Sequence, residues 1–152
     1  MSRGTRSDPY EGRPYRERGP IRGPVLIATA GVVLAAGMTM TWVRVPGADI
    51  DVRGIDASTS VQVLVLSQAA ALLVLGCIRR RLSAVLAIVL SITVAWRGVL
   101  ILRDGVALAA SDLGDVSFGP GTWLVFASSI LALAGGAILL GELARAPRGD
   151  RG

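Results

Sequence analysis

Four long apolar runs, separated by short polar segments, constrain this chain more than any other feature of its sequence. The runs cover residues 25–43, 61–78, 82–102 and 122–144, and only Arg97 and Glu142 carry charge within them. An α-helix needs about 20 apolar residues to cross the hydrocarbon core of a bilayer. A soluble protein of 152 residues would have too little remaining chain to cover four such helices. We therefore predict an all-α membrane protein, a bundle of four transmembrane helices over residues 25–144.

The composition agrees with this fold class and argues against several kinds of chemistry. Hydrophobic residues make up 52% of the chain and the mean hydropathy is +0.58, which is unusually apolar for a soluble domain. The chain has no His and a single Cys, so it gives no support for a zinc site, a disulfide framework or His-based acid–base catalysis. No nucleophile–base pair, phosphate loop or metal-ligand spacing is recognisable either. We predict no cofactor and no catalytic residue.

The arginines predict the orientation of the chain. Residues 1–24 are rich in Gly, Pro and Arg and are expected to be disordered, and residues 145–152 form a short polar tail. All sixteen basic residues are Arg, and twelve of them lie in these two tails and in the turn between the second and third runs. By the positive-inside rule, both termini and this turn are cytoplasmic. The twelve are Arg3, Arg6, Arg13, Arg16, Arg18, Arg22, Arg79, Arg80, Arg81, Arg145, Arg148 and Arg151.

This placement predicts a multi-pass protein of the inner (plasma) membrane. It also explains the calculated isoelectric point of about 10.9 without a nucleic-acid partner. The basic side could bind anionic lipid headgroups, at about 1 kcal/mol for each basic residue near the surface. A solvated tail that only sets the topology is the simpler alternative.

Three tryptophans give a second line of evidence on orientation. Trp42 ends the first run, Trp96 lies near the end of the third, and Trp123 opens the fourth. In a four-span topology with cytoplasmic termini, all three lie toward the outer face of the membrane. Indole rings prefer the membrane–water interface. We therefore predict that all three tryptophans are interface anchors.

Two short loops are expected on the outer side. In the first, Val43 and Val45 alternate with Arg44, and a similar alternation over residues 49–53 follows a Pro-Gly turn. This pattern is typical of a β-hairpin with short arms. The second loop, residues 103–121, ends in Gly-Pro-Gly directly before Thr122, which is a candidate N-cap for the fourth helix.

Two polar residues inside the runs are the candidates for a functional contact. Arg97 lies about 8 Å below the outer end of its helix at 1.5 Å per residue, where burying an arginine in lipid is unfavourable. It could contact an ion, a lipid phosphate or a substrate within the bundle. The alternative is an arginine that extends toward headgroups or toward an acidic residue such as Asp104. Gln68 lies at similar depth on the neighbouring run and is a candidate hydrogen-bond partner.

Small residues recur at a spacing of four in two of the runs. Ser128, Ala132 and Gly136 share one face of the fourth run, and Gly31 and Ala35 share one face of the first. Such faces allow helices to approach closely, so they are candidate contact surfaces for partner helices.

The order of segments resembles a known group of proteins. An Arg-rich tail precedes a span ending in "TW", a polar loop with "DVRGIDAS", a span, "RRR", another span, and "GPGTW" at the start of the last span. This layout over residues 25–144 resembles small four-span membrane proteins of actinobacteria, and among named groups the Trp-biosynthesis-associated membrane protein family. The resemblance rests on the Trp and Gly positions and implies a membrane protein of undefined activity. It transfers no functional residue.

These features predict a non-catalytic accessory or scaffold protein of a membrane complex, in contact with the lipid bilayer and with a membrane-protein partner or further copies of itself. The alternative is a small oligomeric transporter or channel subunit, because four helices alone enclose little volume. A lipid-modifying enzyme is a third reading, and it would need residues from a partner.

Overall fold

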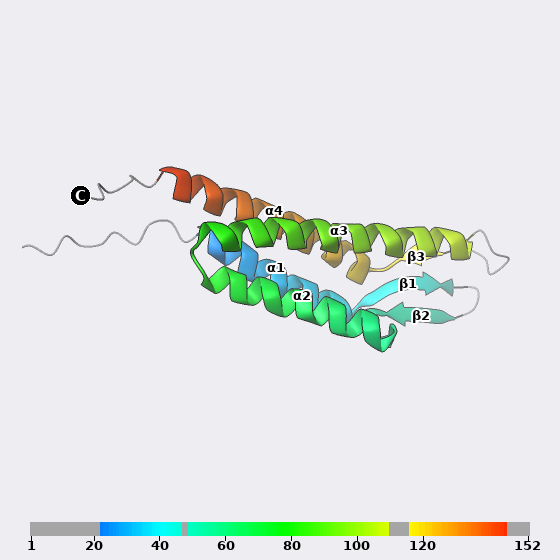
Figure 1. Cartoon of the computed structure of the whole chain (residues 1–152). Helices are drawn as coiled ribbons and strands as arrows, with labels where there is room; N and C mark the ends of the chain where they lie inside the picture. The colour runs from blue at the N-terminus through cyan, green and yellow to red at the C-terminus, as the bar shows by residue number, and fades with distance from the viewer. Residues whose placement is uncertain (1–21, 47–48, 110–115, 146–152) are drawn as a thin grey trace, which may run out of the picture.

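The computed structural model describes residues 22–46, 49–109 and 116–145. Four helices dominate it: α1 (Arg22–Thr39), α2 (Thr59–Cys77), α3 (Arg81–Ala109) and α4 (Pro120–Arg145). Each helix is long and apolar enough to cross a membrane, as the sequence predicted. The start of α1 and the end of α4 lie at the same end of the bundle as the turn between α2 and α3 (Figure 1). We call this the turn end, and the opposite end, which carries a small β-sheet, the sheet end.

The helix boundaries differ from the predicted spans by more than two residues at three places. Helix α1 begins at Arg22, inside the segment predicted to be disordered; residues 1–21 of that segment lie outside the described residues, as do residues 146–152 of the C-terminal tail. The same helix ends at Thr39 instead of residue 43. Helix α3 continues to Ala109, seven residues beyond its predicted end at 102, so the second loop is shorter than expected.

The helices follow one another around the bundle in the order α2, α1, α4, α3. Extensive contacts join α2 to α1, α1 to α4 and α4 to α3, whereas α2 and α3 have far fewer contacts with each other. In Figure 1, α2 and α3 meet at the turn end and diverge toward the sheet end. The bundle is therefore open along one side in its sheet-end half.

Small residues explain the close approach of the other helices. A Cβ added at Gly31 would lie 2.7 Å from the Ala69 carbonyl oxygen of α2, and one at Gly135 would lie 2.9 Å from the backbone nitrogen of Ile27 in α1. The hydroxyl of Ser128 in α4 donates a hydrogen bond of 2.8 Å to the Ala30 carbonyl of α1. The small-residue faces predicted to meet partner helices are thus used inside this bundle.

The outward faces of the helices are apolar as well. The exposed large side chains on these faces include Val63, Leu66, Val74, Val85, Val89, Ile92, Ile130 and Leu133. A soluble bundle would place polar residues there, because exposed apolar surface is unfavourable in water. A bundle that is hydrophobic all round is typical of a membrane span.

The sheet end carries three antiparallel strands in the order β2-β1-β3: β1 (Thr41–Val45), β2 (Ile50–Arg53) and β3 (Ser117–Phe118). Strands β1 and β2 form the hairpin that the alternation of Val43, Arg44 and Val45 predicted, with both valines buried and the arginine exposed. Strand β3 was not predicted. It comes from the second loop and pairs with β1 through Val43 and Arg44. A short 3-10 turn (Gly54–Asp56) then leads into α2.

Candidate functional site

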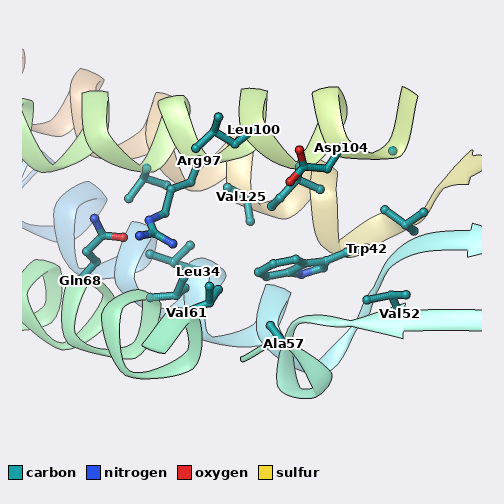
Figure 2. Close-up of a pocket in the computed structure, with 15 residues that line it drawn as sticks. Leu34, Trp42, Val52, Ala57, Val61, Gln68, Arg97, Leu100, Asp104 and Val125 are labelled. Carbon is teal, nitrogen blue, oxygen red and sulfur yellow. The ribbon is translucent and has the colours of Figure 1, made fainter. Parts of the chain in front are cut away.

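The divergence of α2 and α3 leaves a pocket of about 320 Å³ in the sheet-end half of the bundle. Helices α2 and α3 form its side walls, Leu34 of α1 and Val125 of α4 lie at its back, and the hairpin covers its sheet end (Figure 2). Across the pocket from α1 and α4, the two side walls α2 and α3 have few contacts with each other and diverge toward the sheet end. The lining residues are Leu34, Trp42, Val43, Val52, Ala57, Val61, Val65, Gln68, Val94, Arg97, Leu100, Ile101, Asp104, Gly105 and Val125.

Trp42 closes the pocket at its sheet end. A β-bulge between Thr41 and Val43 interrupts the pairing of β1 with β2, so Trp42 and Val43 both point into the protein. The indole Nε1 donates a hydrogen bond of 2.8 Å to the Gly37 carbonyl at the end of α1. A Cβ at Gly54 would lie 2.5 Å from the indole, so that glycine gives the ring its space.

The backbone carbonyl of Trp42 connects the sheet to α4 through hydrogen bonds. Its carbonyl accepts a hydrogen bond of 2.9 Å from the Gly119 amide and a second, of 2.7 Å, from the Thr122 hydroxyl. Thr122 lies in the first turn of α4, which begins at Pro120, and its side chain is fully buried. The prediction that Thr122 is the N-cap is therefore wrong. Proline at the first helical position already provides the start of this helix, and the threonine bonds to β1 instead.

Gln68 is the most buried polar residue of the pocket, with 7% of its surface exposed. Its amide nitrogen donates a hydrogen bond of 3.0 Å to the Thr93 hydroxyl of α3 and so links the two side walls. Its amide oxygen Oε1 is buried and has no hydrogen-bond partner among the described residues. A buried acceptor without a partner is unfavourable by about 1–3 kcal/mol.

Arg97 extends from α3 into the pocket. Figure 2 shows its guanidinium group directed toward the Gln68 amide oxygen, although the two do not form a hydrogen bond. In the part of the chain that the structure describes, Arg97 forms no ion pair; the ion pair found there joins Arg44 and Asp51 on the sheet. Asp104 lines the same pocket seven residues further along α3, toward the sheet end.

The structure thus places both Arg97 and Gln68 in one pocket, but they do not form the predicted hydrogen bond with each other. Gln68 bonds to Thr93, which sequence reasoning did not single out, and Arg97 forms no ion pair among the described residues. Two spacings could have indicated this pocket: Val61, Val65 and Gln68 lie on one face of α2, and Arg97, Ile101 and Asp104 lie on one face of α3.

The three predicted interface tryptophans fall into two groups. Trp96 and Trp123 are 64% and 59% exposed on the outer surfaces of α3 and α4, where lipid could contact them. Trp42 is only 6% exposed and belongs to the protein core. The sequence alone does not separate them, because the bulge that turns Trp42 inward depends on pairing with β2.

The lining of the pocket is mostly apolar, with a few polar groups. No group of three or more His, Cys, Asp or Glu side chains that could hold a metal ion occurs within residues 22–46, 49–109 and 116–145. The pocket walls are aliphatic apart from Trp42, Gln68, Arg97 and Asp104. An apolar cavity with a few converging polar groups is the usual form of a small-molecule site.

Comparison of the chain with models of known protein families, with curated proteins and with solved structures finds no match.

Proposed function

We propose that this chain is a non-catalytic accessory or scaffold protein of a membrane complex, and that its cap binds the partner. The cap comprises the hairpin and the 3-10 turn (residues 41–46 and 49–57) together with β3. The observation that carries the proposal is that the cap is fixed firmly to the bundle but leaves one sheet edge exposed.

The fixed part of the cap is β1, which lies between the other two strands and holds Trp42 in the core. Helix α2 adds a further tie, since the Gln62 amide donates hydrogen bonds to the carbonyls of Ile55 and Ala57 at 2.6 and 2.9 Å. A surface held in this way presents the same shape to every partner, and little entropy is lost when it binds.

The exposed part of the cap is β2. All four of its residues are exposed, and its outer edge is unpaired within the described sheet. Ile50, Val52 and Ile55 are 49%, 36% and 55% exposed, although Val52 also lines the pocket. Soluble proteins usually protect such edges, and strand addition at an open edge is a common mode of recognition.

The same proposal includes the location of the protein in the cell. The four apolar helices and the arginine count support a multi-pass protein of the plasma membrane, with both termini and the turn end cytoplasmic and the cap outside. Arginines at the turn end would then contact anionic headgroups. The resemblance to small actinobacterial four-span proteins and to the Trp-biosynthesis-associated group stays a prediction.

Affinity capture from native membranes tests the scaffold role. The cap variant carries Ile50→Ala and Ile55→Ala, and a matched control carries Val89→Ala and Ile92→Ala on the exposed face of α3. We expect the proteins captured by the wild type to be lost with the cap variant and kept with the control. Unchanged capture by the cap variant would contradict a partner site on β2.

A transporter or channel subunit is the second candidate, and the pocket is the observation that favours it. The pocket ends near Gln68 and Val94, and beyond it α2 and α3 converge toward the turn end. One copy therefore offers a binding site in one half of the bundle, and passage through the other half would require an assembly of several copies.

A further inference from the structure

We propose that the pocket binds a single-chain amphiphile with one carboxyl head group, which enters from the membrane between α2 and α3. The carboxyl group would contact Arg97 and Gln68, and the apolar chain would occupy the rest of the cavity. Val52 belongs to both the cap and the pocket, but the polar contacts of this site lie between α2 and α3, so the site does not depend on the scaffold role.

The polar groups determine the head group. The guanidinium of Arg97 offers hydrogen-bond donors and a positive charge, and the Gln68 oxygen requires a donor. A carboxylate supplies both partners: its oxygens accept hydrogen bonds from Arg97, and a water bound to one of them donates to Gln68. Such a ligand satisfies the buried acceptor and neutralises a cation in an apolar setting, where charge-assisted bonds are strongest.

The charge of the site favours a monoanion. Arg97 is the only basic residue among the lining residues, and Asp104 lines the same cavity nearer the sheet end. A phosphate monoester, with close to two negative charges, would leave one charge without a partner and would be repelled by Asp104 more strongly than a monoanion. A carboxylate matches the single arginine.

The volume and shape of the cavity determine the apolar part. A cavity of about 320 Å³ is at the lower end of the range for small-molecule sites. It holds about ten groups of the size of a water molecule, which suits one hydrocarbon chain but not the two chains of a phospholipid. The valine and leucine side chains of the walls have no hydrogen-bonding groups that need a partner. Trp42 provides a flat apolar surface at the end of the cavity far from Gln68.

Tryptophan fluorescence can follow binding, because Trp42 lines the pocket whereas Trp96 and Trp123 are exposed elsewhere. The full chain with Trp96→Phe and Trp123→Phe keeps Trp42 as its single tryptophan. It is reconstituted in nanodiscs of unbrominated zwitterionic phospholipid. Three quenchers are titrated: a brominated fatty acid, its neutral methyl ester, and a brominated anionic phospholipid.

We expect the fatty acid to quench Trp42 fluorescence saturably. The ester should need a concentration about tenfold higher or more for half-maximal quenching, because it cannot form the charged hydrogen bond with Arg97. Arg97→Gln should weaken the acid to a similar degree. Arg103→Gln, which removes an exposed arginine of the same helix outside the pocket, should change nothing. The comparison of acid with ester needs no pocket variant, so it tests the proposal even if Arg97→Gln does not fold.

Equal, non-saturating quenching by acid and ester would show that Trp42 senses only bulk lipid and would overturn the proposal. Saturable quenching by the anionic phospholipid alone would overturn the single-chain ligand. Saturable binding of the acid that is unchanged by Arg97→Gln would overturn the assignment of the head-group contact.

Discussion

The two halves of the bundle are held together in different ways. In the turn-end half, glycines and alanines bring backbones into direct contact, as between Gly135 of α4 and Ile27 of α1. In the sheet-end half, a large indole and a few hydrogen bonds to carbonyl groups join the helices to the strands. Glycines allow close approach at the sheet end as well, since a Cβ at Gly121 of α4 would lie 2.9 Å from the Gly37 carbonyl oxygen of α1. Only in that half do α2 and α3 diverge, and a pocket lies between them. The difference suggests that the sheet-end half provides a binding site in addition to contacts that stabilise the fold.

The largest effect is expected from Trp42→Ala, which removes the main contact of the sheet-end half. Truncating a buried large aromatic residue typically lowers the free energy of unfolding by about 3–5 kcal/mol. The hydrogen bond to the Gly37 carbonyl is lost as well. Thermal unfolding in detergent should show a clear loss of stability, and proteolysis should show that the hairpin is released while the helices remain. A hairpin that stays protected would show that the indole does not hold the cap.

The turn-end half is tested by Gly135→Ala, for which the chain offers a matched control. The added Cβ would lie 2.9 Å from atoms of Gly23 and Ile27, so α1 and α4 must separate. Overpacking of this kind typically lowers the free energy of unfolding by about 1–3 kcal/mol. Gly141→Ala in the same helix meets nothing within 4 Å and should be neutral or slightly stabilising. Equal melting temperatures for the two variants would contradict the close-packing account.

Removing the hydrogen bond between the Thr122 hydroxyl and the Trp42 carbonyl should lower the stability less than Trp42→Ala or Gly135→Ala does. Thr122→Val keeps the shape of the side chain but removes the hydrogen bond to the Trp42 carbonyl, which still accepts from Gly119. Interhelical hydrogen bonds in membrane proteins contribute about 0.6 kcal/mol on average. We expect a small decrease in melting temperature. A decrease as large as that of Trp42→Ala would place the main contact at Thr122 instead.

The smallest effect is expected from the ion pair on the sheet surface. Arg44 Nε lies 2.7 Å from an Asp51 carboxylate oxygen, and this hydrogen bond lowers the pKa of Asp51 below its ordinary value. A depressed pKa in the folded state adds stability above the unfolded value of about 3.9, and this stability is lost as the pH falls through the folded pKa. Both side chains are largely exposed, so solvent weakens the pair.

The measurement for this pair is the stability of Asp51→Asn relative to the wild type at two pH values. We expect a small deficit for the variant at pH 7 that disappears once Asp51 is protonated. A deficit that persists at low pH would show that the carboxylate charge is not its cause.

The sequence was sufficient to predict the four helices, because an apolar run of about 20 residues has few alternatives. It did not separate the end of α1 from β1, since Thr41, Trp42 and Val43 are as compatible with a membrane span as with a strand. It also placed the end of α3 too early, because Arg103 and Asp104 suggest a loop although both lie within the helix. Charge at a helix end does not by itself end the helix.

The site was predicted only in part, and the reason is the same in each case. Arg97 and Gln68 stood out because polar residues are rare in apolar runs. Thr93, the partner of Gln68, is unremarkable in sequence, and Trp42 resembled an interface anchor. Their roles depend on contacts between segments far apart in the chain, including the pairing of β1 with β3. Periodicity within one segment carries no information on such contacts.

The central claim is that the four helices cross a membrane with the cap and the pocket toward the outer side. Cysteine labelling in intact cells tests it, with Cys77→Ser as background because the native cysteine is exposed. In that background, a membrane-impermeant thiol reagent should label Asp51→Cys on β2 from outside and should label Arg80→Cys at the turn end only after the cells are opened. Labelling of Arg80→Cys in intact cells, with Asp51→Cys protected, would contradict the account.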